Sequence, residues 1–350
     1  MSHFIIIARL PGSLAMNEIE PALATLMQPF KEYDGEPEML RYCTFEPDEK
    51  TEATWLDEDY SAFVDPDGVA HSRYEKRFAR TVKRDGDPFG STEYVCPDGW
   101  TEESVKADRL YPNYDAFMRD WCGYKGRDAK HGVYGHYRNP NGFWDWYSIG
   151  GRWMGYFKPR TIATADVDVG EPGTFDNTCE PGKADVLRAS NVDWEAAEND
   201  ARKRCADFIA YYERHVIGDE PDTMGFDSPR NRGFDLGVLD CKPVSKLTDA
   251  ERDPTRYKIR PWERQSNAAD PQCDVWLIED ARTLAARWPA FVGPFAVVDA
   301  DGWHAKSKMG WFGCSHSQTE EPAHAFKRRM LDRLKGGDQS DWLVAVDCHV

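Results

Sequence analysis

Regular apolar patterns at both ends of this chain constrain its fold more than any other feature. At the N-terminal end, residues 4–10 are a β-rich apolar run followed by Pro11 and Gly12, which predicts a buried strand. Apolar residues then recur at helical spacing from 19 to 30, with prolines placed in the first turn and near the end. The chain therefore begins with a strand and a helix.

The C-terminal end carries a second set of patterns. Residues 293–298 and 303–313 are strand-like and are separated by an Asp-Gly pair, which is typical of a tight hairpin. A helix is predicted from 319, because acidic residues stand in its first turn and basic residues near its end. Residues 342–348 are almost continuously apolar, which favours a central strand.

Together the two ends give the order strand, helix, strand, strand, helix, strand. This order predicts an α+β protein with a ferredoxin-like split βαβ core, whose strands would lie in the spatial order 4-1-3-2. The core would be a discontinuous domain of residues 1–30 and 290–350. Residues 31–289 would form a large mixed insertion, which carries a tryptophan-rich segment and a long amphipathic helix at 192–217.

The predicted sheet makes a geometric prediction at one edge. His3, the segment from Cys314 to His316, and the end of the last strand would gather there. Asp347 and His349 share one face of that strand, because side chains alternate. An Asp–His pair near a Cys-x-His can bind a metal or serve as a general base with a nucleophile, so Asp347 and His349 are candidate catalytic residues. The alternative is a fraying strand end with no chemistry.

The tryptophan-rich segment, residues 144–153, is the other candidate site. Tryptophan packs well only in particular surroundings, so three within ten residues indicate a rigid aromatic feature. The paired glycines before an arginine allow close backbone approach or positive φ. The predicted ligand-binding residues are Trp144, Asp145, Trp146, Gly150, Gly151, Arg152 and Trp153. The arginine and glycine amides would hold an anion while an indole stacks on a planar group. Alternatively, the aromatics are core, the glycines a bulge, and Asp145–Arg152 an internal ion pair.

The overall charge excludes some classes of partner. A formal net charge of −17 argues against broad nucleic-acid binding and against attachment to an anionic membrane. No apolar stretch approaches the length of a membrane span, and no signal peptide is recognisable. Nine cysteines without a Cys-x-x-Cys pair indicate reduced thiols and a cytoplasmic protein.

Neither a metal site nor a cofactor is assigned from the sequence. His131 and His136 fit a metal-binding loop only loosely, and solvated histidines are the simpler interpretation. A locally basic segment at 73–84 suggests an anion-binding helix, although neutralisation of nearby carboxylates is the simpler function.

Three short motifs resemble a family of uncharacterised proteins of tailed bacteriophages and prophages. They are WDWYSIGGRW at 144–153, MGWFG at 309–313 and VDCHV at 346–350. The opening strand and helix are similar as well, but the chain departs from the family at residues 31–33. The resemblance implies a phage-derived protein of the host cytoplasm and carries no established activity.

The sequence thus suggests two functions of different classes. The first is a phage accessory or counter-defence protein that binds a nucleotide-like or other anionic aromatic ligand, and that hydrolyses it if Asp347 and His349 face the same cleft. The second is a non-enzymatic inhibitor that binds a host protein through an acidic surface.

Overall fold

The protein was analysed as a computed structural model, which describes most of the 350-residue chain. The described residues are 2–82, 90–160, 166–172, 179–218, 220, 241–243, 247–249, 257–259, 274–277, 280–289, 291, 293–309, 315–317 and 321–350. They form two compact units, one of residues 1–34 and 141–350 and the other of residues 35–140. These boundaries differ from the predicted ones, because most of the expected insertion belongs to the first unit.

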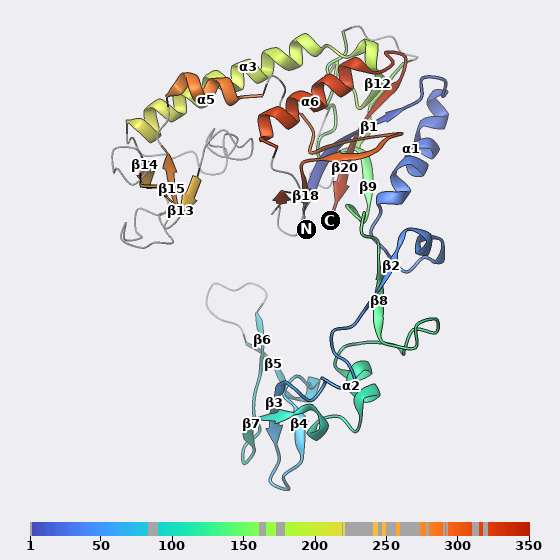
Figure 1. Ribbon diagram of the computed structural model, residues 1–350, viewed down its shortest axis with the longest axis vertical. Helices are drawn as coiled ribbons and strands as arrows, with labels where there is room; N and C mark the ends of the chain where they lie inside the picture. Colours follow the sequence, from blue (N-terminus) through green and yellow to red (C-terminus); the bar gives the residue numbers. More distant parts are fainter. Residues whose placement is uncertain are drawn as a thin grey trace. The chain divides into compact units, whose positions relative to one another are not determined.

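The first unit is built on a mixed sheet with the strand order β10-β12-β20-β1-β16-β17. Its strands are β1 (His3–Leu10), β10 (Val167–Asp168), β12 (Val186–Arg188), β16 (Ala296–Asp299), β17 (Gly302–Ala305) and β20 (Trp342–His349). As predicted, β20 is central, and every one of its residues is buried. It pairs antiparallel with β1 over the full length of both strands, so the two termini lie side by side (Figure 1).

The α+β class is confirmed, but the predicted ferredoxin-like strand order is wrong. The four terminal strands lie in the order 4-1-2-3, because β16 runs parallel to β1 and lies directly beside it. All four residues of β16 are buried, whereas those of β17 are only partly buried. The fully buried strand therefore takes the interior place, and the hairpin turns its more exposed strand to the edge.

The tryptophan-rich segment belongs to this sheet. β9 (Tyr147–Gly151) pairs with the second half of β20, beyond the point where β12 leaves it, and β11 (Glu171–Pro172) pairs with β9. β12 also lies within the sheet, beside β20. This part of the insertion thus completes the sheet, whereas residues 35–140 form the second unit.

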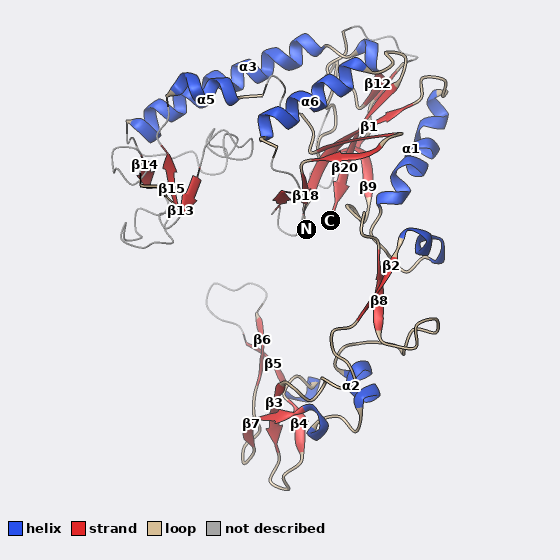
Figure 2. Cartoon of the chain, in the orientation of Figure 1, coloured by secondary structure: helices blue, strands red, loops and turns tan. Residues whose placement is uncertain are grey.

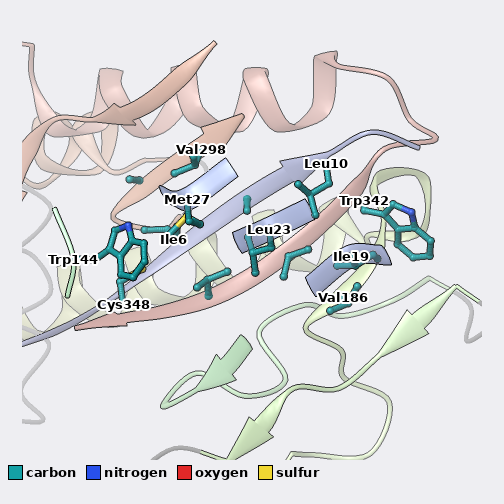
Figure 3. Close-up of a cluster of buried hydrophobic side chains, with 14 of the residues drawn as sticks. Ile6, Leu10, Ile19, Leu23, Met27, Trp144, Val186, Val298, Trp342 and Cys348 are labelled. Carbon is teal, nitrogen blue, oxygen red and sulfur yellow. The ribbon is translucent and has the colours of Figure 1, made fainter. Parts of the chain in front are cut away.

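One helix covers each face of the sheet (Figure 2). α1 (Ile19–Met27) packs on the face formed by Phe4, Ile6 and the alternate residues of β20 (Figure 3). α6 (Ala323–Gly336) packs on the opposite face, against Ile7 and its neighbours. This division follows from strand alternation, which sends successive side chains to opposite faces.

The remaining elements of the first unit are peripheral to this sheet. The predicted long helix is α3 (Trp194–Tyr211), which Asp193 caps and which continues as a π-helical segment, Tyr212–Ile217. α5 (Ala281–Arg287) packs on α3. The short strands are β13 (Cys241–Pro243), β14 (Tyr257–Ile259), β15 (Asp274–Leu277), β18 (Ser307–Met309) and β19 (Ser315–Ser317).

The second unit contains small antiparallel sheets and one helix, α2 (Tyr114–Asp120). Asn113 caps α2, its side chain accepting from the amide of Ala116. The strands are β2 (Thr44–Pro47), β3 (Asp59–Val64), β4 (Ala70–Ser72), β5 (Ala79–Val82), β6 (Ser91–Tyr94), β7 (Thr101–Lys106) and β8 (Gly135–Arg138). The basic segment is not the suggested α-helix, because its described part forms a 3-10 turn, Lys76–Phe78, and β5. None of the described helices in either unit is both long and apolar enough to cross a membrane.

Candidate functional site

The site begins where the first and last strands meet. The register of β1 and β20 places His3 opposite His349 and Ile5 opposite Asp347. These side chains share one face of the sheet, as the alternation predicted. His3 Nδ1 lies 2.9 Å from Asp347 Oδ1, and their side chains are 5% and 1% exposed. A carboxylate can only accept, so the imidazole proton is on Nδ1.

A second Asp–His pair lies beside the first. His349 Nδ1 is 2.7 Å from Oδ1 of Asp145, the residue just after Trp144. The rings of His3 and His349 lie 5.0 Å apart between centroids, at 76° to each other. His349 Nε2 is buried and has no hydrogen-bond partner in the part of the chain that the structure describes. Each carboxylate orients its imidazole and leaves Nε2 for other chemistry.

Trp146 covers this pair on the outside. Its ring stacks on His349 with centroids 4.9 Å apart at 17°, and meets the His3 ring edge-on at 5.2 Å. The indole is 41% exposed. Of the two tryptophans flanking Asp145, only Trp146 therefore lies at the site. Trp144 is 5% exposed and belongs to the core on the other face of the sheet, beside Cys348 (Figure 3).

Gly151 and the amide of Arg152 do hold an anion, but it is a carboxylate of the chain itself. The Arg152 amide donates to Asp347 Oδ2 at 2.9 Å. Gly151 has φ +54, and a Cβ there would lie 2.4 Å from Asp347. The glycine is needed for this close approach as well as for its backbone angle. The predicted ligand cradle is thus filled from within, and Asp145 bonds to His349.

Gly150 faces a second buried carboxylate, Asp185. A Cβ on Gly150 would lie 2.8 Å from Asp185 Oδ2. Asp185 is fully buried and accepts from the amides of Gly155, Tyr156 and Gly170. Burial raises the pKa of this carboxyl, against the lowering effect of the three amides. Asp185 therefore fixes the loop after β9, and we assign it no chemistry.

A cavity of about 650 Å³ lies on the same face of the sheet. Trp153 and Ile5 line it, and Ile5 is the cross-strand neighbour of Asp347. Among the described residues, Arg152, Asp347 and His349 do not line it. The cavity is therefore next to the Asp–His pairs and is not the same space, so it is not the cleft holding Asp347 and His349 that the predicted hydrolysis required.

Sequence reasoning missed most of this cavity. Its aromatic lining includes Trp153, Tyr156, Trp194 and Phe291, and its cationic lining is Lys158, Lys183 and Arg204. Burial raises the pKa of the Tyr156 hydroxyl, although Arg204 lowers it. Trp194 is 5% exposed, and its Nε1 has no hydrogen-bond partner among the described residues. These residues come from four separate segments, and only the Trp153 segment had carried a signal.

The other sequence candidates do not reach the site. His131 pairs with Asp128 at 2.8 Å, and His136 lies 3.4 Å from Glu46, both on the second unit. The side chains of Cys314 and His316 lie outside the described residues. Within the described part of the chain, no group of three or more His, Cys, Asp or Glu is placed to hold a metal ion.

Comparison of the chain with known protein families, with curated proteins and with solved structures finds no match.

Proposed function

We propose that the protein binds an anionic aromatic ligand, nucleotide-like in chemistry, in the cavity beside Trp153. The observation that carries the proposal is a concave space of about 650 Å³ whose lining combines indole rings with cationic side chains. This volume is within the range of ordinary small-molecule sites, and such sites are mainly apolar with a few placed polar groups.

The charges at the cavity favour an anion in spite of the acidic chain. Three cationic residues line it against two acidic ones, whereas the whole chain carries −17. Asp193 and Asp200 are already engaged, since Asp193 caps α3 and Asp200 pairs with Arg204 at 2.6 Å. Among the described residues, the ion-pair partner of Lys183 is the exposed Glu180, at 4.0 Å. Lys183 is therefore the cation we assign to the ligand's negative group.

Aromatic groups would supply the rest of the recognition. In the proposal a planar ring of the ligand stacks on Trp153, and the indole N–H of Trp194 donates to a ligand acceptor. A buried N–H without a partner costs free energy that a ligand acceptor would recover. Stacking and a charge-assisted hydrogen bond contribute on the order of 1 kcal/mol or more each.

Calorimetry with nucleoside mono- and diphosphates tests the proposal directly. We expect binding to weaken about tenfold in Trp153→Ala and in Lys183→Ala, in line with a loss of roughly 1.4 kcal/mol per contact. Lys335→Ala is the matched control, because Lys335 pairs with Glu198 and does not line the cavity. Absence of any heat of binding, or equal affinity in the folded Lys183→Ala variant, contradicts the proposal.

The biological role rests on the phage resemblance and is part of the same proposal. A counter-defence protein would act by sequestering such a ligand in the host cytoplasm. The competing function is inhibition of a host protein through the acidic surface. A single stoichiometric, salt-sensitive partner recovered from host lysate, together with no nucleotide binding, would favour that second function.

A further inference from the structure

The ligand cavity leaves the two Asp–His pairs without a function. His3 and His349 face each other across β1 and β20 with 5.0 Å between ring centroids. Both Nδ1 atoms are held by carboxylates, those of Asp347 and Asp145. The Nε2 of His349 is buried without a partner among the described residues. If the pairs served only to hold β1 and β20 together, this buried nitrogen would be expected to have a hydrogen-bond partner.

We propose that His3 and His349 form a general acid–base pair that hydrolyses a phosphoester bond of the bound ligand. The inference rests on the proposed ligand, because it names the reaction that this ligand would undergo. The two imidazoles are the catalytic residues. Asp145 and Asp347 are positioning residues, because each acts only through the histidine that it orients.

The reaction needs water as its second reactant and balances as follows. The neutral Nε2 of His349 takes a proton from water, and the water oxygen attacks phosphorus. The bond from phosphorus to the leaving oxygen breaks, and that oxygen takes the Nε2 proton of a protonated His3. The two imidazoles have then exchanged protonation states, and proton exchange with solvent restores them.

The order of the two roles is assigned from the ring nitrogens. His349 Nε2 is buried and has no partner among the described residues, so it is the nitrogen assigned to accept a proton from water. His3 is then assigned as the acid.

The cavity brings the ligand within reach of the pair. Ile5 lines the cavity, and His3 is two residues away on the same face of β1, about 7 Å along the strand. A ligand with its aromatic part against Trp153 can extend a phosphoester over this distance. Trp146 forms the outer wall, and because it is 41% exposed its rotation can admit water.

The test is steady-state hydrolysis of the p-nitrophenyl ester of thymidine 5′-monophosphate by the full chain. We expect nitrophenolate release that falls at low pH, where the base is protonated. His349→Gln should lower kcat by about 100-fold or more, whereas His3→Gln should lower it less, because nitrophenolate is a weakly basic leaving group that needs little proton donation. Asp145→Asn should lower kcat, leave KM unchanged and shift the pH profile. His304→Gln is the control, because His304 is also paired with an aspartate but lies on the edge strand β17.

Binding of thymidine 5′-monophosphate, measured in parallel by calorimetry, separates the two proposals. Binding without nitrophenolate release overturns the acid–base pair and leaves the ligand site intact. Release that persists in folded His349→Gln also overturns the pair. Release by the wild type that Lys183→Ala leaves unchanged supports the pair and overturns the cavity as the ligand site. If neither binding nor release is detected, both proposals are rejected for this class of nucleotide.

Discussion

The same sheet holds another aspartate–histidine pair, in the β16–β17 hairpin, and its aspartate has different partners from those at the candidate site. In the β16–β17 hairpin, His304 Nε2 lies 3.1 Å from Asp299 Oδ1. Arg333 of α6 donates to both oxygens of Asp299 and also pairs with Asp301. Burial would raise the pKa of the Asp299 carboxyl, but Arg333, His304 and the Asp301 amide outweigh it and lower the pKa.

The ion-pair partners described for Asp347 and Asp145 are imidazoles, those of His3 and His349. At Asp299 a permanent guanidinium holds the carboxylate, and His304 adds a further hydrogen bond. Aspartate and histidine thus belong to a fixed ion pair at Asp299, whereas the proposal above assigns them to a proton-exchanging pair at His3 and His349. Three predictions test this distinction, beginning with the largest expected effect.

Gly151→Ala should disrupt the candidate site and destabilise the first unit by about 3 kcal/mol. Strain at positive φ contributes about 1–2 kcal/mol, and the clash with a buried group adds a similar amount. The new Cβ would lie 2.4 Å from Asp347, so the carboxylate that orients His3 must move. Chemical denaturation measures the loss.

Gly132→Ala provides the matched control for this prediction. Gly132 also has a left-handed backbone, with φ +71, but nothing lies within 4 Å of its added Cβ. It should cost only the strain, about 1–2 kcal/mol in the second unit. If Gly151→Ala and Gly132→Ala lose the same amount of stability, the Asp347 side chain can move aside without cost and is not held in place by the loop.

Arg333→Met should cost about 2 kcal/mol at neutral pH, because it leaves the largely buried Asp299 carboxylate without its guanidinium. The folded pKa of Asp299 is lowered, so the stability it contributes is present above the unfolded pKa, about 3.9, and is lost as pH falls through the folded pKa. The difference between variant and wild type should therefore shrink below about pH 4.

Arg329→Met is the control for this second prediction. Arg329 stands one turn earlier in α6, is 52% exposed and pairs with Glu321. An exposed pair of this kind contributes less than about 1 kcal/mol. A loss at Arg333 no greater than that at Arg329 would remove the contrast between a fixed ion pair and the histidine site.

Part of the candidate site could be read from the sequence. The alternation of residues 347–349 and the pairing of both chain ends predicted that His3, Asp347 and His349 would meet, and they do. This prediction succeeded although the predicted strand order was wrong, because the pairing of β1 with β20 alone determines whether these three side chains are neighbours. That pairing followed from two long apolar runs, which are strong and local signals.

The function of the glycine pair could not be read in the same way. That the space at Gly151 is occupied by Asp347 depends on the register of β9 against β20, which joins residues almost two hundred positions apart. β12 is equally hidden, because Val186–Arg188 is a three-residue strand in a segment rich in turn-forming residues. Such short elements are selected by tertiary packing and leave no periodicity in the sequence.

The smallest expected effect concerns Trp146, whose ring stacks on the site histidine His349. Trp146→Leu should change stability by less than about 1 kcal/mol, since the ring is 41% exposed. It should nevertheless uncover His349 and speed its acylation by diethyl pyrocarbonate, read by mass spectrometry, with His304 as the internal reference. Trp121→Leu, at 40% exposure in the second unit, is the control. If His349 reacts no faster in Trp146→Leu, the indole does not govern access, and the histidine site is as closed as the hairpin pair.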